Sequence, residues 1–468
     1  MAESDGWIPL FIIVLIVIGS CIMLYFEPER TRTVLKLAAP VMAGMVSVTL
    51  LSVVDTAMVG RLGATALAAS GLGGQMFWLV MGSLGALSIG TQAIAARRVG
   101  EGRNEAAGQV IDNAAMIALA VGVVMTVLGE ILVPILFPFM IHDPEVAKLG
   151  VGYLQARFMG ALPFMVMWSF RGFYNGISRM VVPMRVAILV NVVNIFLNWV
   201  MIYGKLGFPK WGVFGAGVAS SVATTVGAVA MVLTAYYGGY RKQYQLFHKG
   251  NASAEIKKAV VKLALPTTMQ NALAMTGFAV FLSMIGLIGT AQQAVSNVIF
   301  TIMSISFLPG VSFGIAASTL ISQKLGEGEP KVAEAMGWES MKLSATLMGT
   351  LGIIFMLFPS DLLKIFTNDA SLIKIGVVPL MIMGAVQAFD GIGMTMSSAL
   401  QGAGMNRWVM VAEVCISWGL FIPLTYGMGI MAGWGIVGAW IAVGVYLALF
   451  STVCSLKFAG GSWQKVKI

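Results

Sequence analysis

The stretch RRVGEGRNEAAG, at residues 97–108, returns in the second half of the chain as QKLGEGEPKVAEA at 323–335. Aligned residues lie 226 positions apart, and the same separation relates VLKLAAP at 34–40 to VVKLALP at 260–266. Two further pairs of segments keep this offset. A constant offset over such a length indicates an internal duplication, with a repeat too long for a solenoid.

The composition indicates that both copies lie in a lipid bilayer. Of the 468 residues, 58% are hydrophobic and only 10% are charged, and the mean hydropathy is +0.88. Soluble domains carry about 25% charged residues. Apolar stretches recur that are long enough to cross a hydrocarbon core of about 30 Å, whereas a membrane barrel would show short segments of alternating polarity. We therefore predict an all-α polytopic membrane protein.

The apolar stretches predict one extra N-terminal helix and twelve core helices, six in each copy. Because six is even, both copies start on the same side, which predicts two parallel six-helix bundles related by a pseudo-twofold axis along the membrane normal. The spans are expected near 8–26, 34–59, 66–95, 109–138, 148–171, 181–204, 212–237, 259–285, 292–322, 335–359, 371–400, 407–431 and 434–458.

These spans predict four parts of the chain. Residues 1–29 carry the extra transmembrane helix, 30–237 the N-terminal bundle, 238–258 a basic cytoplasmic linker and 259–468 the C-terminal bundle. The start of the chain, MAESDG, is acidic, which is the reverse of a secretory signal. We therefore expect the first helix to be retained, with the N-terminus outside.

The basic residues predict the orientation. Of the 29 Lys and Arg residues, 22 fall on one side of the predicted helices, and the excess marks the cytoplasmic side. The C-terminus is then cytoplasmic, and the expected location is the cytoplasmic (inner) membrane. The net charge of +9 is explained by these loops, so we expect no nucleic-acid partner.

Several motifs carry a resemblance to a known family. They are SVVDTAMVGRLG at 52–63, RGFYNGISRMVVPM at 171–184, NIFLNWVMIYG at 194–204, KLGEGEP at 324–330 and LQGAGMN at 400–406. Together they resemble the multidrug and toxic compound extrusion (MATE) family. The resemblance implies export of amphipathic, often cationic, organic compounds in exchange for inward H⁺ or Na⁺, by rocking of two bundles.

Two acids, Asp55 and Asp390, fall well inside predicted helices. A carboxylate at bilayer depth costs about 2.5–3.5 kcal/mol on insertion scales, so such residues more often mark ion paths. Neither acid is duplicated, because Asp55 aligns with Phe281 and Asp390 with Phe164. Each bundle is therefore expected to hold its own site. The structural alternative for Asp55 is a salt bridge to Arg61.

The fifth core helix carries Asn191, Asn194 and Asn198 on one face. A carboxylate flanked by amide oxygens suits a desolvated Na⁺ and equally a carboxyl group that exchanges protons. The resemblance adds Ser220, where relatives often have a hydroxyl. We predict a cation or proton coupling site at Asp55, Asn194, Asn198 and Ser220, with Na⁺ as a candidate ligand of the first three. The alternative is hydrogen bonding between helices, which Asn commonly provides in membranes.

The chain departs from the family pattern at two places. Some relatives carry a second Asp where this chain has Asn198, so the site depends on one carboxylate. Others carry a Glu on the seventh core helix where this chain has Ala274, with Gln270 and Asn271 nearby. We predict a second-lobe site for an ion or substrate at Asp390, Gln270 and Asn271.

Two rival functions would require different sequence features. A flippase for a lipid-linked precursor, from the same wider superfamily, should show more basic residues inside the spans. A membrane enzyme needs His, Cys or paired acids near the membrane surface, but His142 and His248 fall in loops and the three cysteines form no CxxC pair. We therefore expect a monomeric transporter and not an enzyme. Its partners are small organic substrates and the bilayer, and it needs no cofactor besides the coupling ion.

Overall fold

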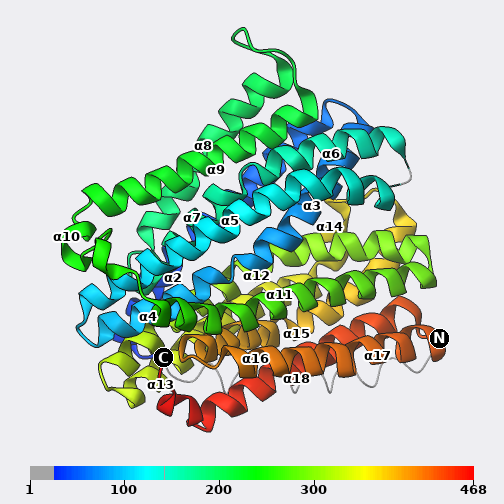
Figure 1. Ribbon diagram of the computed structural model, residues 1–468. Helices are drawn as coiled ribbons and strands as arrows, with labels where there is room; N and C mark the ends of the chain where they lie inside the picture. The colour runs from blue at the N-terminus through cyan, green and yellow to red at the C-terminus, as the bar shows by residue number, and fades with distance from the viewer. Residues whose placement is uncertain (1–25, 142) are drawn as a thin grey trace. The chain divides into compact units, whose positions relative to one another are not determined.

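The computed structural model describes residues 26–141 and 143–468, and it is helical throughout this part of the chain, without strands (Figure 1). The predicted helix at 8–26 lies outside the described residues, apart from residue 26. Eleven helical segments within the described ranges are long and apolar enough to cross a membrane. They confirm an all-α polytopic membrane protein. The segments are Pro28–Gly60 (α2), Ala64–Gly100 (α3 and α4), Asn104–Met140 (α5), Val181–Tyr203 (α8), Gly212–Tyr237 (α9), Ala254–Ile288 (α11), Thr290–Gly326 (α12), Pro330–Leu357 (α13), Ala370–Gly402 (α15), Asn406–Met431 (from α16 onward) and Gly435–Ala459 (α18).

The predicted span 148–171 is instead two helices, α6 (Pro144–Phe158) and α7 (Ala161–Gly176). The break lies at Gly160, where an added Cβ would overlap the side chain of Ser221 on α9. A similar break separates α3 (Ala64–Leu84) from α4 (Leu87–Gly100) at Gly85, which packs against the Trp168 ring. Hydropathy does not predict either break, because the residues on both sides are apolar.

The predicted span 407–431 is the most irregular. It begins as α16 (Asn406–Ile416) and continues through two π-helical segments, Ser417–Phe421 and Thr425–Met431, on either side of α17 (Ile422–Leu424). Pro423 lies between them and has no backbone N–H to donate, so the regular α-helical hydrogen bonding cannot continue through it.

The described helices form two compact units. The N-terminal unit comprises Pro40–Ala272, Gly326–Gly328 and Ile468, and the C-terminal unit comprises 26–39, Leu273–Leu325 and Glu329–Lys467. The division passes through α2 at Pro40 and through α11 after Ala272. The bundle boundaries predicted from the repeat stay a prediction.

The core of the N-terminal unit is formed by α3 to α7 and α9, around buried rings such as Phe77, Phe137 and Phe170. Small residues let the helices approach closely. At Gly172 on α7 an added Cβ would overlap the backbone of Ser88 on α4. In Figure 1 α8 and α9 run side by side, so polar residues of α8 can contact those of α9. The C-terminal unit packs around Phe281, among other rings.

The segment predicted as a linker is folded onto the N-terminal unit. It contains α10 (Tyr240–Tyr244) and the 3₁₀ turn Lys249–Asn251. Asp112 of α5 accepts hydrogen bonds from Asn251 Nδ2 at 2.7 Å and from the Phe247 backbone N–H at 2.8 Å. This buried carboxylate therefore fixes the segment to α5.

Candidate functional site

Hydrogen bonds across α2, α8 and α9 connect all four residues of the predicted coupling site. Asn198 Nδ2 donates to Asp55 Oδ1 at 2.6 Å and to Asn194 Oδ1 at 2.8 Å. Asn194 Nδ2 in turn donates to Ser220 Oγ at 3.1 Å. Because Asn194 and Asn198 are one helical turn apart on α8, their amides line up between the carboxylate on α2 and the hydroxyl on α9. The chain Asp55–Asn198–Asn194–Ser220 is called the first-lobe network below.

The first-lobe network is buried except at its acid. Asn198 and Asn194 are 1% and 3% exposed, while Asp55 is half-buried. The Oδ1 atom of Asn198 is buried and has no hydrogen-bond partner in the described part of the chain. Buried polar atoms are nearly always paired, so this oxygen is a site where a cation or water is expected. Asp55 accepts through Oδ1, which leaves Oδ2 available in the same neighbourhood.

These oxygens fit the coupling ions that the resemblance implies. A carboxylate and an amide carbonyl are hard acceptors, which suit an alkali cation, and the carboxylate alone can take a proton. No group of three or more His, Cys, Asp or Glu residues that could hold a metal occurs among the described residues. Any cation bound here would therefore be held by one carboxylate and neutral oxygens. Such a ligand set favours a cation that binds and leaves again over one that stays bound permanently.

Part of the asparagine face on α8 serves to join helices. Asn191 Nδ2 donates to Ser47 Oγ of α2, and Tyr203 Oη donates to the Met58 carbonyl oxygen at 2.8 Å. The two contacts lie on either side of the bond between Asn198 and Asp55. They hold α8 against α2, so the position of the carboxylate is set by more than its own hydrogen bond.

Sequence reasoning missed one charged residue of this site. Tyr153 of α6 packs in an apolar cluster with Val59 of α2, and one turn after Tyr153 comes Arg157, near the end of α6. Its guanidinium carbon lies 4.2 Å from the centroid of the Phe77 ring. The signal in the sequence was an arginine inside a predicted span. Arg61, the partner considered from the sequence, is exposed.

In the C-terminal unit, Asp390 lies on α15 and is 6% exposed. Its Oδ2 atom is buried and has no hydrogen-bond partner among the described residues. One turn earlier, Gln387 donates to Ser306 Oγ on α12 at 2.6 Å, and its own Oε1 is buried and likewise unpaired in the described chain. Gln387 and Ser306 were missed from the sequence. The signal was an amide one helical turn from the acid.

The remaining residues predicted for the second-lobe site belong to the other unit. Gln270 and Asn271 lie on the part of α11 that packs in the N-terminal unit, whereas Asp390 belongs to the C-terminal unit. Gln270 is buried and Asn271 is half-buried. Their grouping with Asp390 stays a prediction.

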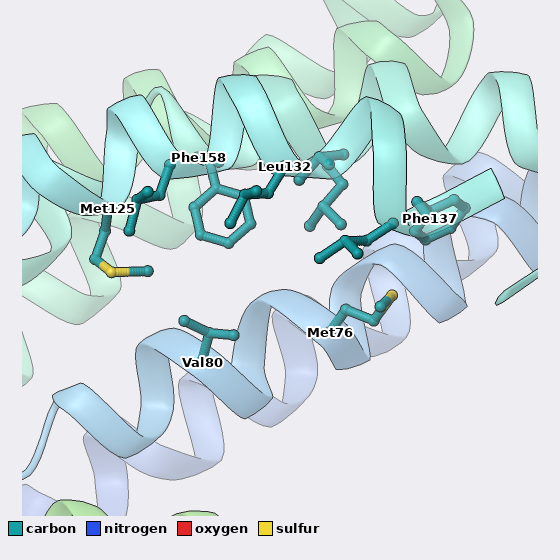
Figure 2. Close-up of a pocket in the computed structure, with 11 residues that line it drawn as sticks. Met76, Val80, Met125, Leu132, Phe137 and Phe158 are labelled. Atoms are coloured by element: carbon teal, nitrogen blue, oxygen red, sulfur yellow. The ribbon is translucent and has the colours of Figure 1, made fainter. Parts of the chain in front are cut away.

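A separate apolar pocket of about 160 Å³ lies between α3 and α5, next to α6. Figure 2 shows Met76 and Val80 on one side and Met125, Leu132 and Phe137 on the other. All eleven residues that line it are apolar or glycine. The pocket holds no group that could exchange an ion.

Comparison with known proteins agrees with the repeat and the motifs. The MatE family model matches residues 40–200 and 266–427, so that each copy of the repeat contains one match. The chain is 31% identical over 443 residues to a probable multidrug resistance protein NorM from Thermotoga maritima, with 94% of each chain covered. It is 26% identical to a multidrug resistance protein NorM from Photobacterium profundum, with 86% of this chain and 88% of that one covered.

Solved structures show the same fold. One is described as the outward-facing conformation of a multidrug resistance MATE family transporter of the MOP superfamily. It superimposes with a TM-score of 0.87 at 22% identity and covers 94% of this chain and 97% of that one. A MOP superfamily transporter from Pyrococcus furiosus gives a TM-score of 0.84 with the same coverage. From the two family matches and the extended similarity to the Thermotoga protein, this chain belongs to the MATE family.

Proposed function

We propose that this protein is a secondary antiporter that exports amphipathic, often cationic, organic compounds in exchange for inward H⁺ or Na⁺. The observation that carries the proposal is the first-lobe network, which places an intramembrane carboxylate beside a buried amide oxygen that has no partner among the described residues. The names of the relatives, which describe multidrug resistance proteins, support the class of substrate.

The coupling step follows from the cost of charge in the membrane. An ionised Asp55 is expensive away from water, and a bound proton or Na⁺ removes most of that cost. Binding therefore shifts the balance between conformations in which the site opens to one side or the other. The ion enters where it is concentrated, and its release on the cytoplasmic side returns the carboxylate to its charged form.

The proposed second-lobe role for Asp390 is to bind a cation. Its Oδ2 and the Oε1 of Gln387, one helical turn away, are both buried and have no hydrogen-bond partner among the described residues. Two buried acceptors without donors attract a positive charge, either from the ammonium group of a substrate or from a second coupling ion. Gln270 and Asn271 remain proposed contributors.

Orientation and assembly are proposed as the sequence predicts them. The C-terminus faces the cytoplasm and the N-terminus faces the outside, because the basic residues concentrate on one side of the spans. The protein acts as a monomer on small organic substrates in the cytoplasmic membrane. Labelling of single introduced cysteines with a membrane-impermeant reagent in intact cells tests the orientation.

The function is tested by reconstitution into liposomes. A fluorescent organic cation is loaded, a pH gradient or a Na⁺ gradient is imposed separately, and the rate of efflux is compared with that of protein-free liposomes. We expect one gradient to drive efflux in wild-type protein. Efflux that responds to neither gradient would contradict antiport. Movement of a fluorescent lipid-linked precursor between leaflets, in the same vesicles, would support the flippase alternative.

A further inference from the structure

Arg157 is a cation without an obvious counter-charge. It is half-buried near the end of α6, and its guanidinium rests on the Phe77 ring. Its Nε atom is buried and has no hydrogen-bond partner, and the side chain forms no salt bridge within the described ranges. A charged group withdrawn from water is normally paired, so this arrangement needs an explanation.

The backbone of α6 holds Arg157 beside the first-lobe network. Ser221 Oγ donates to the Ala156 carbonyl oxygen at 2.6 Å and to that of Arg157 at 3.3 Å. Ser221 follows Ser220, the last member of the network, on α9. Close packing of α6 on α9 reinforces this contact, because an added Cβ at Gly217 would meet Ala156 at 2.8 Å.

Packing also brings α6 close to the part of α2 that carries Asp55. Tyr153, one turn before Arg157 on α6, packs in one apolar cluster with Val59, one turn after Asp55 on α2. The described side chain that donates a hydrogen bond to the carboxylate is the neutral amide of Asn198 on α8. Arg157 therefore lies on the helix that packs beside the Asp55 segment, and it forms no salt bridge among the described residues.

We propose that Arg157 is a tethered counter-cation for Asp55, which pairs with the free carboxylate after the coupling ion leaves and returns to the Phe77 ring when an ion binds. The proposal rests on the proposed antiport function. An aromatic face is a favourable second position for a guanidinium, because the ring electrons attract it without requiring an anion. The long side chain can move between the two positions while its backbone stays fixed on α9.

This exchange has two consequences for transport. The incoming ion must displace the guanidinium, which weakens its binding and speeds its release. The ion-loaded state also carries one positive charge on Arg157 that no carboxylate neutralises, and in a low-dielectric interior this charge repels a cationic substrate. Ion and cationic substrate then exclude each other from this lobe, as antiport requires.

The test compares Arg157→Gln, Arg157→Lys, Asp55→Asn and the double variant Asp55→Asn/Arg157→Gln in full-length purified protein. Radioactive Na⁺ binding and proton uptake in weak buffer report ion affinity, and gradient-driven efflux is measured in liposomes. An opposite charge beside a carboxylate typically changes its ion affinity by about tenfold or more. We therefore expect Arg157→Gln to bind the coupling ion at least about tenfold more tightly and to export more slowly.

The controls separate charge from folding. Arg157→Lys keeps the charge, so its ion affinity should stay near that of wild type even though the contact of the guanidinium with the Phe77 ring is lost. In the Asp55→Asn background, Arg157→Gln should change ion binding no further, because the two residues act on one event. Equal ion affinity in wild type and Arg157→Gln, with binding abolished by Asp55→Asn, would overturn the role of the arginine alone. Unchanged ion binding in Asp55→Asn would overturn the proposed coupling site as well.

Discussion

Replacing Asp55 by Asn is the sharpest perturbation of the proposed coupling site, because it removes the charge and keeps the shape. The Asn198 amide can still donate to a carbonyl oxygen at position 55. A hydrogen bond to a charged acceptor contributes about 1.5–3 kcal/mol and a neutral one about 0.5–1.5 kcal/mol, so the exchange weakens this bond by about 1 kcal/mol. The variant also avoids an intramembrane carboxylate, which costs about 2.5–3.5 kcal/mol on insertion scales.

These opposing terms leave the stability of Asp55→Asn within about 2 kcal/mol of wild type, so it should insert and purify normally. Efflux driven by a pH or Na⁺ gradient in liposomes should fall to the rate of protein-free vesicles, because no group remains to take the ion. The matched control is Arg61→Gln, which removes an exposed charge from the turn that follows the same helix. Wild-type efflux from Asp55→Asn, or an equal loss in Arg61→Gln, would refute the reasoning.

Three further changes have distinct expected outcomes. Asp390→Asn should weaken export of cationic compounds more than neutral ones, and equal loss for both in the liposome assay would point to ion coupling or folding instead. Asp112→Ala leaves the backbone N–H of Phe247 without its acceptor and removes one of the two acceptors of Asn251 Nδ2, so we expect the free energy of unfolding to fall by about 2–4 kcal/mol, with a lower unfolding temperature in detergent. A chain without residues 1–28 should insert and export normally, and a cysteine placed at Ser4 of the full chain should react with an impermeant reagent outside the cell.

The fold was predictable to the extent that it depends on hydrophobic length and on the repeat. Apolar stretches show where a chain can cross a bilayer, and the constant offset divides them between two copies. The interruptions at Gly85 and Gly160 were not predicted. They depend on which neighbouring helix approaches each residue, and this is not visible in mean hydropathy.

At the site, too, features set by one helix were predictable, and contacts between helices were not. Asn194 and Asn198 were predicted to act together because helical periodicity alone places them on one face. The grouping with Asp55 followed from the resemblance, and in the structure Asn198 Nδ2 donates to Asp55 Oδ1 at 2.6 Å. Arg157 was missed, because its proximity to Asp55 requires the packing of α6 on α9. A spacing along one helix carries no information about that contact.

The structure also gives a physical reason why neither acid is duplicated. Phe281, which aligns with Asp55, is fully buried, and its ring lies 5.7 Å from that of Trp440 in the core of the C-terminal unit. Phe164, which aligns with Asp390, lies 5.7 Å from Phe77 in the core of the N-terminal unit. A carboxylate in either place would lose this packing and be buried among aromatic rings, at a cost of several kcal/mol. In the C-terminal copy the position equivalent to Asp55 is therefore used for packing by Phe281. In the N-terminal copy the position equivalent to Asp390 is used for packing by Phe164.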